Sequence, residues 1–125
     1  MKQIFVTAAI SGMLAVALGA FGAHIIKKMI TPDMLEVYKT GVQYHFYHTF
    51  ALLATGILLY LQPSKSLKTA AYLFMAGIVL FSGSLYALAI TGIKALGIIT
   101  PFGGVAWLIA WLLLAIHFGK YTRTE

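Results

Sequence analysis

The chain has 125 residues, of which 61% are hydrophobic and only 10% are charged. About a quarter of the residues in an average soluble domain are charged, so this composition excludes an ordinary soluble protein and indicates a membrane protein. The net charge of +6 comes from nine Lys/Arg against three Asp/Glu. These cations lie at the ends of apolar runs, where they anchor helices and meet lipid phosphates, so they do not indicate a nucleic-acid partner. Without cysteine, disulfides and thiolate chemistry are excluded.

Four runs without a charged residue follow one another, each 24 or 25 residues long: 3–26, 40–64, 69–93 and 95–119. A helix needs about 20 apolar residues to cross a hydrocarbon layer roughly 30 Å thick. We therefore predict an all-α integral membrane protein whose four transmembrane helices form one up-down bundle over residues 1–125. The expected spans are about 4–26, 40–62, 69–92 and 100–119.

The first run also imitates a secretory signal peptide, because Lys2 precedes it and small residues close it. The run is longer than the roughly 7–15 apolar residues of a signal sequence, so we interpret it as a retained first span. Ser11, Ala15, Gly19 and Ala23 recur at four-residue spacing within it. Small residues at this spacing let helix backbones approach closely in lipid, so they predict a packing face.

A short amphipathic helix is predicted between the first two spans, over about residues 32–40. Thr31 is a suitable N-cap, Pro32 suits the first helical position, and Asp33 complements the helix dipole. Apolar side chains then repeat at helical spacing from residue 34 to residue 42, with charged residues on the other side. We expect this helix to lie at the membrane interface and to turn into the second span near Gly41.

The orientation follows from the basic residues in the short loops. An even number of spans places both termini on the side of Lys65 and Lys68, which carries five basic residues: Lys2, Lys65, Lys68, Lys120 and Arg123. The other side carries four: Lys27, Lys28, Lys39 and Lys94. This small excess predicts that both termini are cytoplasmic.

Polar residues collect in the outer half of the predicted bundle, on the side opposite the termini. The apolar runs contain no carboxylate, which disfavours a carboxylate-driven pump; their groups that titrate near neutral pH are histidines. His45 and His48 are three residues apart and share a face of the second span. The candidate ligand-binding residues are His24, Gln43, Tyr44, His45, His48, Ser84, Tyr86 and Lys94.

This cluster has several interpretations. The simplest is a structural plug, in which Tyr and Ser hydroxyls satisfy the imidazoles. A second is a site for an amphiphile, with Lys27, Lys28 and Lys94 near an anionic head group. A third is haem or metal binding through His24 with His45 or His48, although a histidine pair without acid or Cys partners is a weak signal. Enzyme chemistry is disfavoured, because no nucleophile motif or carboxylate partner accompanies the histidines.

Four runs also resemble a known family: Leu18–His24, Thr40–His48, Phe81–Gly92 and Ile99–Gly104. In order and content they are similar to the small membrane proteins known as domain of unknown function 423, or uncharacterised protein family 0382, which are related to animal transmembrane protein 256. The resemblance implies a bacterial cytoplasmic-membrane protein with several spans. It implies no activity and no catalytic residues.

Together these observations predict a non-enzymatic membrane component whose outer polar cluster binds a lipid-like ligand or a partner. The alternative is a small oligomeric transporter or lipid-handling protein, because one short bundle has little room for a pathway. We expect membrane lipids as partners, further copies of the chain as possible partners, and no cofactor.

Overall fold

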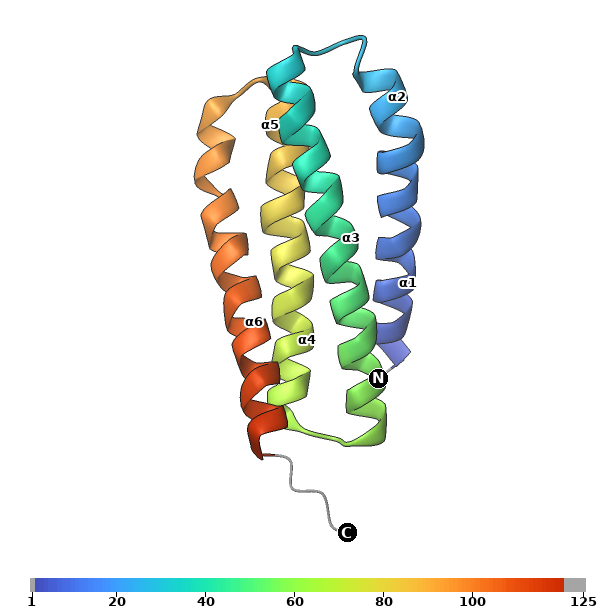
Figure 1. Cartoon of the computed structure of the whole chain (residues 1–125), viewed down its shortest axis with the longest axis vertical. Helices are drawn as coiled ribbons and strands as arrows, with labels where there is room; N and C mark the ends of the chain where they lie inside the picture. The colour runs from blue at the N-terminus through green and yellow to red at the C-terminus, as the bar shows by residue number, and fades with distance from the viewer. Residues whose placement is uncertain (1, 121–125) are drawn as a thin grey trace.

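A computed structural model describes residues 2–120 as four helical rods standing side by side (Figure 1). Two of the rods contain a short π-helical segment that leaves their direction unchanged. In chain order the elements are α1 (Lys2–Val16), η1 (Ala17–Gly22), α2 (Ala23–Ile26), α3 (Pro32–Leu61), α4 (Lys65–Gly77), η2 (Ile78–Ser82), α5 (Gly83–Thr91), η3 (Lys94–Ile98) and α6 (Thr100–Lys120). The predicted all-helical architecture is confirmed.

The rods begin and end at residues whose local chemistry favours these positions. The Thr31 hydroxyl accepts a hydrogen bond from the Met34 N–H at 3.2 Å, and Pro32 follows at the first helical position, as predicted. Ser64 caps α4 in the same way. Gly92, at φ 73°, ends α5 in the left-handed conformation that glycine adopts without strain.

The predicted separate interfacial helix over residues 32–40 is wrong, as is the turn near Gly41, because α3 runs without interruption from Pro32 to Leu61. The apolar face of its first turns packs against the other rods. Tyr38 is completely buried and donates a hydrogen bond to the Leu18 carbonyl at 2.6 Å. A side chain added at Gly41 would lie 3.0 Å from the Tyr86 ring. Contact with the bundle therefore keeps this segment straight.

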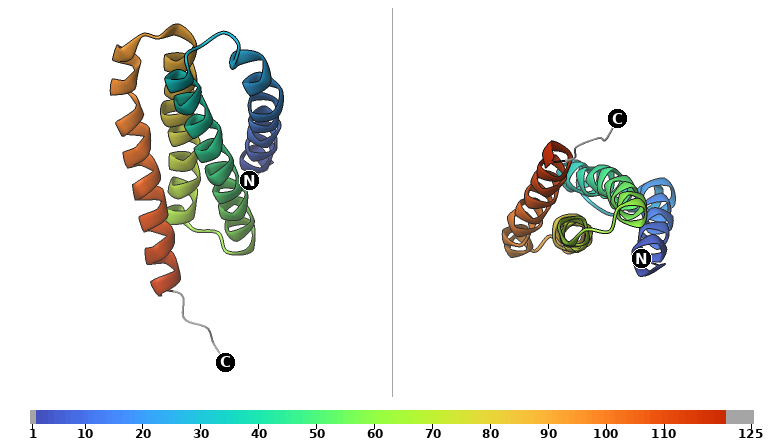
Figure 2. Two further views of the ribbon diagram at one scale, coloured as in Figure 1. Left: turned by 45° about the horizontal axis from the view of Figure 1, so that its top comes forward. Right: turned by 90° about the horizontal axis from the view of Figure 1, so that it is seen from below.

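The rods form an antiparallel zigzag rather than a closed square. The α4–α5 rod and α3 make the central pair, α1 packs on α3, and α6 packs on α4 and η2 (Figure 2). We call the end where α2 ends and α3 begins the distal end (top of Figure 1), and the opposite end the proximal end. Residues 2 and 120 both lie at the proximal end (Figure 1).

Three of the rods are long and apolar enough to cross a membrane: Lys2–Ile26, Lys65–Thr91 and Lys94–Lys120. Their mean hydropathy is 2.0–2.2, and much of their surface faces outward. α3 is long enough but not apolar enough to be counted with them, because its histidines, tyrosines and Gln43 lower its mean hydropathy. It nevertheless buries ten residues, including both of its histidines, against its neighbours. The most polar rod is thus a central one.

Candidate functional site

The structure divides the predicted outer cluster among several places. Tyr44 and His48 face α6, whereas His45 and Tyr86 meet on the side of α1. Ser84 joins α5 to the start of α6 through Thr100, with 2.5 Å between the two hydroxyl oxygens. The predicted polar residues therefore do not form one continuous site. Those on α3 belong to two clusters on opposite sides of this helix, and Ser84 makes a separate contact with Thr100.

The remaining candidates lie at the surface. Gln43 is exposed and donates to the Tyr47 hydroxyl at 2.5 Å. His24 is exposed beside a pocket of about 240 Å³ that Lys27 and Lys39 also line. Lys94 is exposed at the start of η3 and is not among the residues that line this pocket. The structure thus does not gather the lysines of the distal end around one anion site.

On the α1 side, a chain of hydrogen bonds links three rods. The Ser11 hydroxyl oxygen lies 2.9 Å from Nε2 of His45 and 2.6 Å from the Thr49 hydroxyl oxygen. Nδ1 of His45 lies 2.8 Å from the Tyr86 hydroxyl oxygen. Both ring nitrogens of this buried histidine are therefore engaged, as in the plug predicted from sequence. The sequence predicts Ser11 only as a packing residue. Its position on the small-residue face of α1 indicates contact with a neighbouring helix, but not its hydrogen bonds to His45 and Thr49.

On the α6 side, His48 is held by three contacts. Its ring stacks on Trp107 with centroids 3.6 Å apart, and its Nε2 accepts a hydrogen bond from the Trp111 N–H at 3.1 Å. Its Nδ1 lies 2.8 Å from the Tyr44 carbonyl oxygen. An indole N–H can only donate and a carbonyl can only accept, so this hydrogen-bond pattern assigns a neutral imidazole with its proton on Nδ1.

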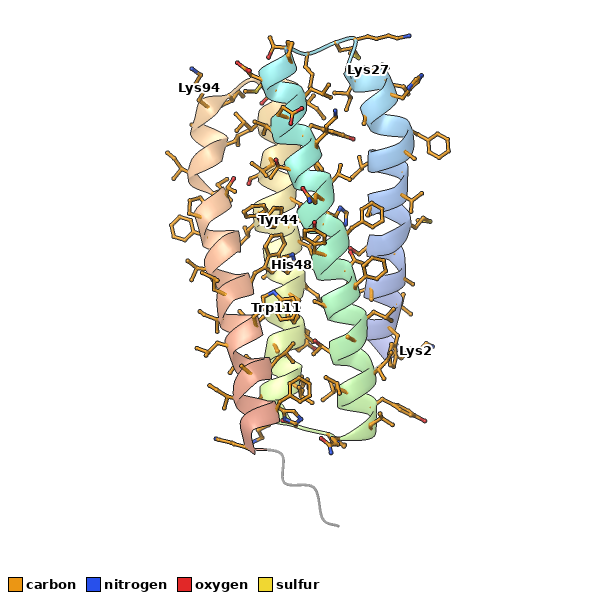
Figure 3. All side chains as sticks on the ribbon, viewed as in Figure 1. Lys2, Lys27, Tyr44, His48, Lys94 and Trp111 are labelled. Atoms are coloured by element: carbon orange, nitrogen blue, oxygen red, sulfur yellow. The ribbon has the colours of Figure 1, made fainter. Side chains whose placement is uncertain are left out.

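These contacts form the floor of an aromatic groove of about 590 Å³, which we call the α3–α6 groove. Figure 3 shows Tyr44, His48 and Trp111 one below another between α3 and α6. The Tyr44 ring packs against Phe81 and Trp107, and its hydroxyl makes no hydrogen bond to the described part of the chain. The lining residues are Tyr44, Tyr47, His48, Phe81, Pro101, Gly104, Val105, Trp107, Leu108 and Trp111.

The structure does not bring together the histidines of the haem or metal site that the sequence suggested as an alternative. No group of three His, Asp or Glu side chains that could hold a metal ion occurs within residues 2–120. His24 is exposed at the distal end, and the nitrogens of His45 and His48 are occupied by hydrogen bonds. His24, His45 and His48 therefore do not form a set of ligands that fits a haem or a metal ion.

The fold defines a small multi-pass helical membrane protein, and within residues 2–120 every buried side-chain nitrogen and oxygen has a hydrogen-bond partner. The family model "Protein of unknown function (DUF423)" matches residues 18–104, and the chain belongs to this family. It is 48% identical over 122 residues to the UPF0382 membrane protein YwdK of Bacillus subtilis, covering 97% of this chain and 99% of that protein.

Two further relatives agree over nearly the whole chain. The UPF0382 membrane protein SAB0533 of Staphylococcus aureus is 42% identical over 97% of this chain and 98% of its own length. The UPF0382 inner membrane protein YgdD of Escherichia coli is 37% identical over 92% of this chain and 88% of its own length. No solved structure matches. The resemblance noted from the sequence is confirmed, and these relatives' names state a membrane location but no molecular function.

Proposed function

We propose that this protein is a non-enzymatic membrane component that binds a lipid-like amphiphile in the α3–α6 groove. The observation that carries the proposal is the aromatic lining of this groove around a rigid floor. Binding sites for small molecules are typically concave, mostly apolar and preformed, with a few polar groups that orient the ligand. The α3–α6 groove has these properties.

The contacts within the groove indicate which part of an amphiphile each wall would meet. Trp107 is 3% exposed and stacks on His48, so it forms the packed base of the groove, above which the exposed Tyr44 ring would meet a chain or ring of the ligand. The exposed Leu108 and Trp111 would cover the ligand from α6. The Tyr44 hydroxyl is available to donate a hydrogen bond to a polar head. A floor that is already ordered reduces the entropy lost on binding.

The engagement of the histidines supports a non-enzymatic role. The nitrogens of His45 meet the Ser11 and Tyr86 hydroxyls, and those of His48 meet the Tyr44 carbonyl and the Trp111 N–H, so neither imidazole is oriented by a carboxylate of residues 2–120, as it is in a catalytic triad. Among residues 2–120 the carboxylates are those of Asp33 and Glu36, both exposed near the distal end. Neither lines the α3–α6 groove, so no acid–base pair faces a ligand bound there.

We also propose that α3 crosses the membrane with the other three rods and that both termini are cytoplasmic. α3 lies between membrane-length rods, and its polar groups bond to those neighbours. The chain has no native cysteine, so single cysteines can be labelled from outside intact cells with a membrane-impermeant maleimide. We expect labelling of Lys28→Cys and protection of Lys65→Cys until the membrane is opened. Labelling of both from outside, or the reverse pattern, would contradict the proposed topology.

Filling the groove should displace the proposed ligand. Leu108 lines the groove and is 70% exposed, whereas Leu112, one turn further along α6, is 57% exposed and outside the lining. We expect native mass spectrometry in mild detergent to show that the wild-type protein and Leu112→Trp retain one amphiphile more than Leu108→Trp does. The affinity for this amphiphile should fall about tenfold in Leu108→Trp, corresponding to about 1.4 kcal/mol of binding free energy.

The same spectra address the alternative of an oligomeric transporter or lipid-handling protein, because they report the number of chains per particle. A monomer that retains an amphiphile which Leu108→Trp displaces supports the binding role. Equal retention by Leu108→Trp and Leu112→Trp would show that the lipid lies elsewhere, and absence of any retained amphiphile would contradict the proposal.

A further inference from the structure

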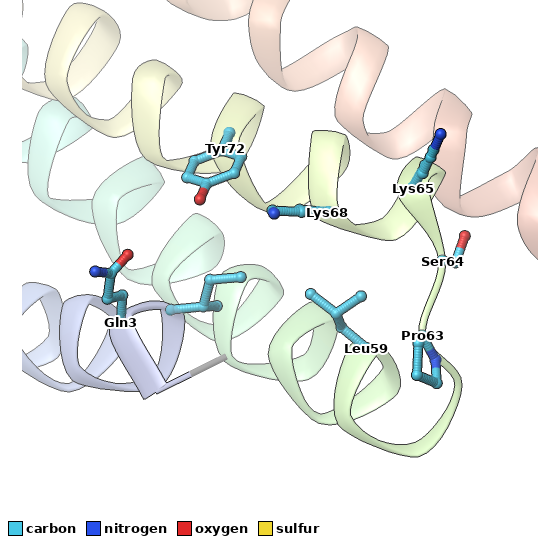
Figure 4. Close-up of a pocket in the computed structure, with 8 residues that line it drawn as sticks. Gln3, Leu59, Pro63, Ser64, Lys65, Lys68 and Tyr72 are labelled. Atoms are coloured by element: carbon cyan, nitrogen blue, oxygen red, sulfur yellow. The ribbon is translucent and has the colours of Figure 1, made fainter.

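A second pocket, of about 500 Å³, lies at the proximal end, far from the α3–α6 groove in the bundle. It is formed where the start of α1, the end of α3 and the start of α4 meet (Figure 4). We call it the proximal pocket; its lining residues are Gln3, Ile4, Leu59, Pro63, Ser64, Lys65, Lys68 and Tyr72. No site was predicted here from the sequence, which indicated only that lysines flank the spans.

The polar lining of the proximal pocket is rich in hydrogen-bond donors. Figure 4 shows the Lys68 amine, the Tyr72 hydroxyl and the Gln3 amide turned toward one opening between α1 and α4, whereas the Lys65 amine points away from it. An ammonium group offers three donors and no acceptor, a phenol offers one donor, and an amide NH₂ offers two. In the part of the chain that the structure describes, no Asp or Glu lines the pocket. This set of groups matches a ligand that accepts hydrogen bonds and carries negative charge.

Among residues 2–120, no carboxylate compensates the positive charge at the proximal pocket. Within residues 2–120 the ion pair is Lys39 with Glu36, on the first turns of α3 at the distal end. Asp33, the other acidic residue in this range, lies in the first turn of α3 at that end. Lys65 and Lys68 are both exposed beside the pocket, so their field acts on whatever enters it.

We propose that the proximal pocket binds the phosphate of an anionic phospholipid head group. The phosphate would lie against Lys68, with Tyr72 and Gln3 as further donors and Lys65 adding charge at the rim. Charge-assisted hydrogen bonds to phosphate are about twice as strong as those between neutral groups. This site is separate from the proposed amphiphile site in position, charge and lining, so either can fail without the other.

Two features favour a lipid head group over a free phosphate ion. The pocket is lined by the exposed Pro63 and the Tyr72 ring above the buried Ile4 and Leu59, so apolar atoms would meet the first carbons of a lipid. The pocket also lies at the level where α1 begins and α3 ends, which is the expected depth of a head group if these rods cross the membrane (Figure 1). A basic pocket between helices at this depth is a typical site for anionic lipids.

The test compares phosphatidylglycerol with phosphatidylcholine of the same chains, added to delipidated protein in mild detergent and counted by native mass spectrometry. We expect phosphatidylglycerol to be preferred, and the preference to fall about tenfold in Lys68→Gln through loss of a charged contact. Lys68→Arg should retain it, and Tyr72→Phe should weaken it about threefold. Lys94→Gln removes one exposed lysine at the distal end and should leave the preference unchanged.

A second experiment compares inorganic phosphate, a soluble anion, with phosphatidylglycerol. We expect phosphate at millimolar concentration to leave the unfolding temperature unchanged, and phosphatidylglycerol to raise it in wild type but not in Lys68→Gln. Stabilisation by phosphate that depends on Lys68, without a preference for phosphatidylglycerol, would overturn the lipid assignment in favour of a soluble anion. Equal binding of the two lipids, or an equal loss in Lys94→Gln, would also overturn the proposal.

Discussion

Replacing Trp107 with alanine is expected to lower the free energy of unfolding by about 3–5 kcal/mol, the range for removing a large buried aromatic side chain. Trp107 is 3% exposed, stacks on His48 and donates a hydrogen bond from its indole N–H to the Phe74 carbonyl at 3.1 Å. It therefore joins α6 to α3 and to α4 at once. Unfolding in detergent by heat or by dodecyl sulfate, followed by circular dichroism, measures the loss.

Trp111→Ala provides the matched control on the same helix. Trp111 is 46% exposed, so less of its surface is lost from the interior, although its hydrogen bond to His48 disappears. We expect a loss of about 1–2 kcal/mol, because interhelical hydrogen bonds in membrane proteins average roughly 0.6 kcal/mol and the buried part of the ring adds to this. Equal losses for the two variants would contradict the assignment of Trp107 as the anchor of α6.

Gly103→Ala should produce the second large effect, a loss of about 2–3 kcal/mol from overpacking. A Cβ at Gly103 would lie 2.9 Å from the Leu80 carbonyl carbon and from the Phe81 Cα. These are backbone atoms of η2, which cannot rotate away as a side chain can, so α6 would have to move outward. Thermal unfolding of the purified variant measures the effect.

The neighbouring glycine is the control. At Gly104 the nearest atoms to an added Cβ belong to the Phe81 ring at 3.8–3.9 Å, which is ordinary van der Waals contact. Gly104→Ala should therefore have wild-type or slightly higher stability, because alanine has a higher helix propensity than glycine. If both alanine variants were equally stable, the close approach of α6 to η2 would not be a feature of the protein.

Much of the fold could be predicted from the sequence, because the physics that sets it is local. The lengths of the four uncharged runs predicted the four helical rods. Thr31 and Pro32 mark the start of α3, and Gly92 marks the end of α5, through their own backbone chemistry. The course of α3 through Gly41 could not be predicted in this way. It depends on Tyr38 reaching the Leu18 carbonyl, a contact between residues distant in sequence.

The candidate site was less predictable for the same reason. Spacing correctly placed His45 and His48 in the interior, but it could not assign their different partners. Residues three apart on a helix are separated by about 60° around its axis, so each can meet a different neighbouring rod. Trp111, which completes the environment of His48, lies 63 positions further along the chain, and its role emerges only when α6 packs on α4 and faces α3 across the groove.

The proposed binding of an amphiphile in the α3–α6 groove can be tested directly, because both tryptophans of the chain line this groove. Delipidated protein would be reconstituted in phospholipid with brominated chains, which quench indole fluorescence on contact. The lipid extracted with wild-type protein, or a plain phospholipid, would then be titrated in. We predict that the extracted lipid restores fluorescence at low mole fraction and saturates. Restoration by both lipids only in proportion to dilution would contradict the site.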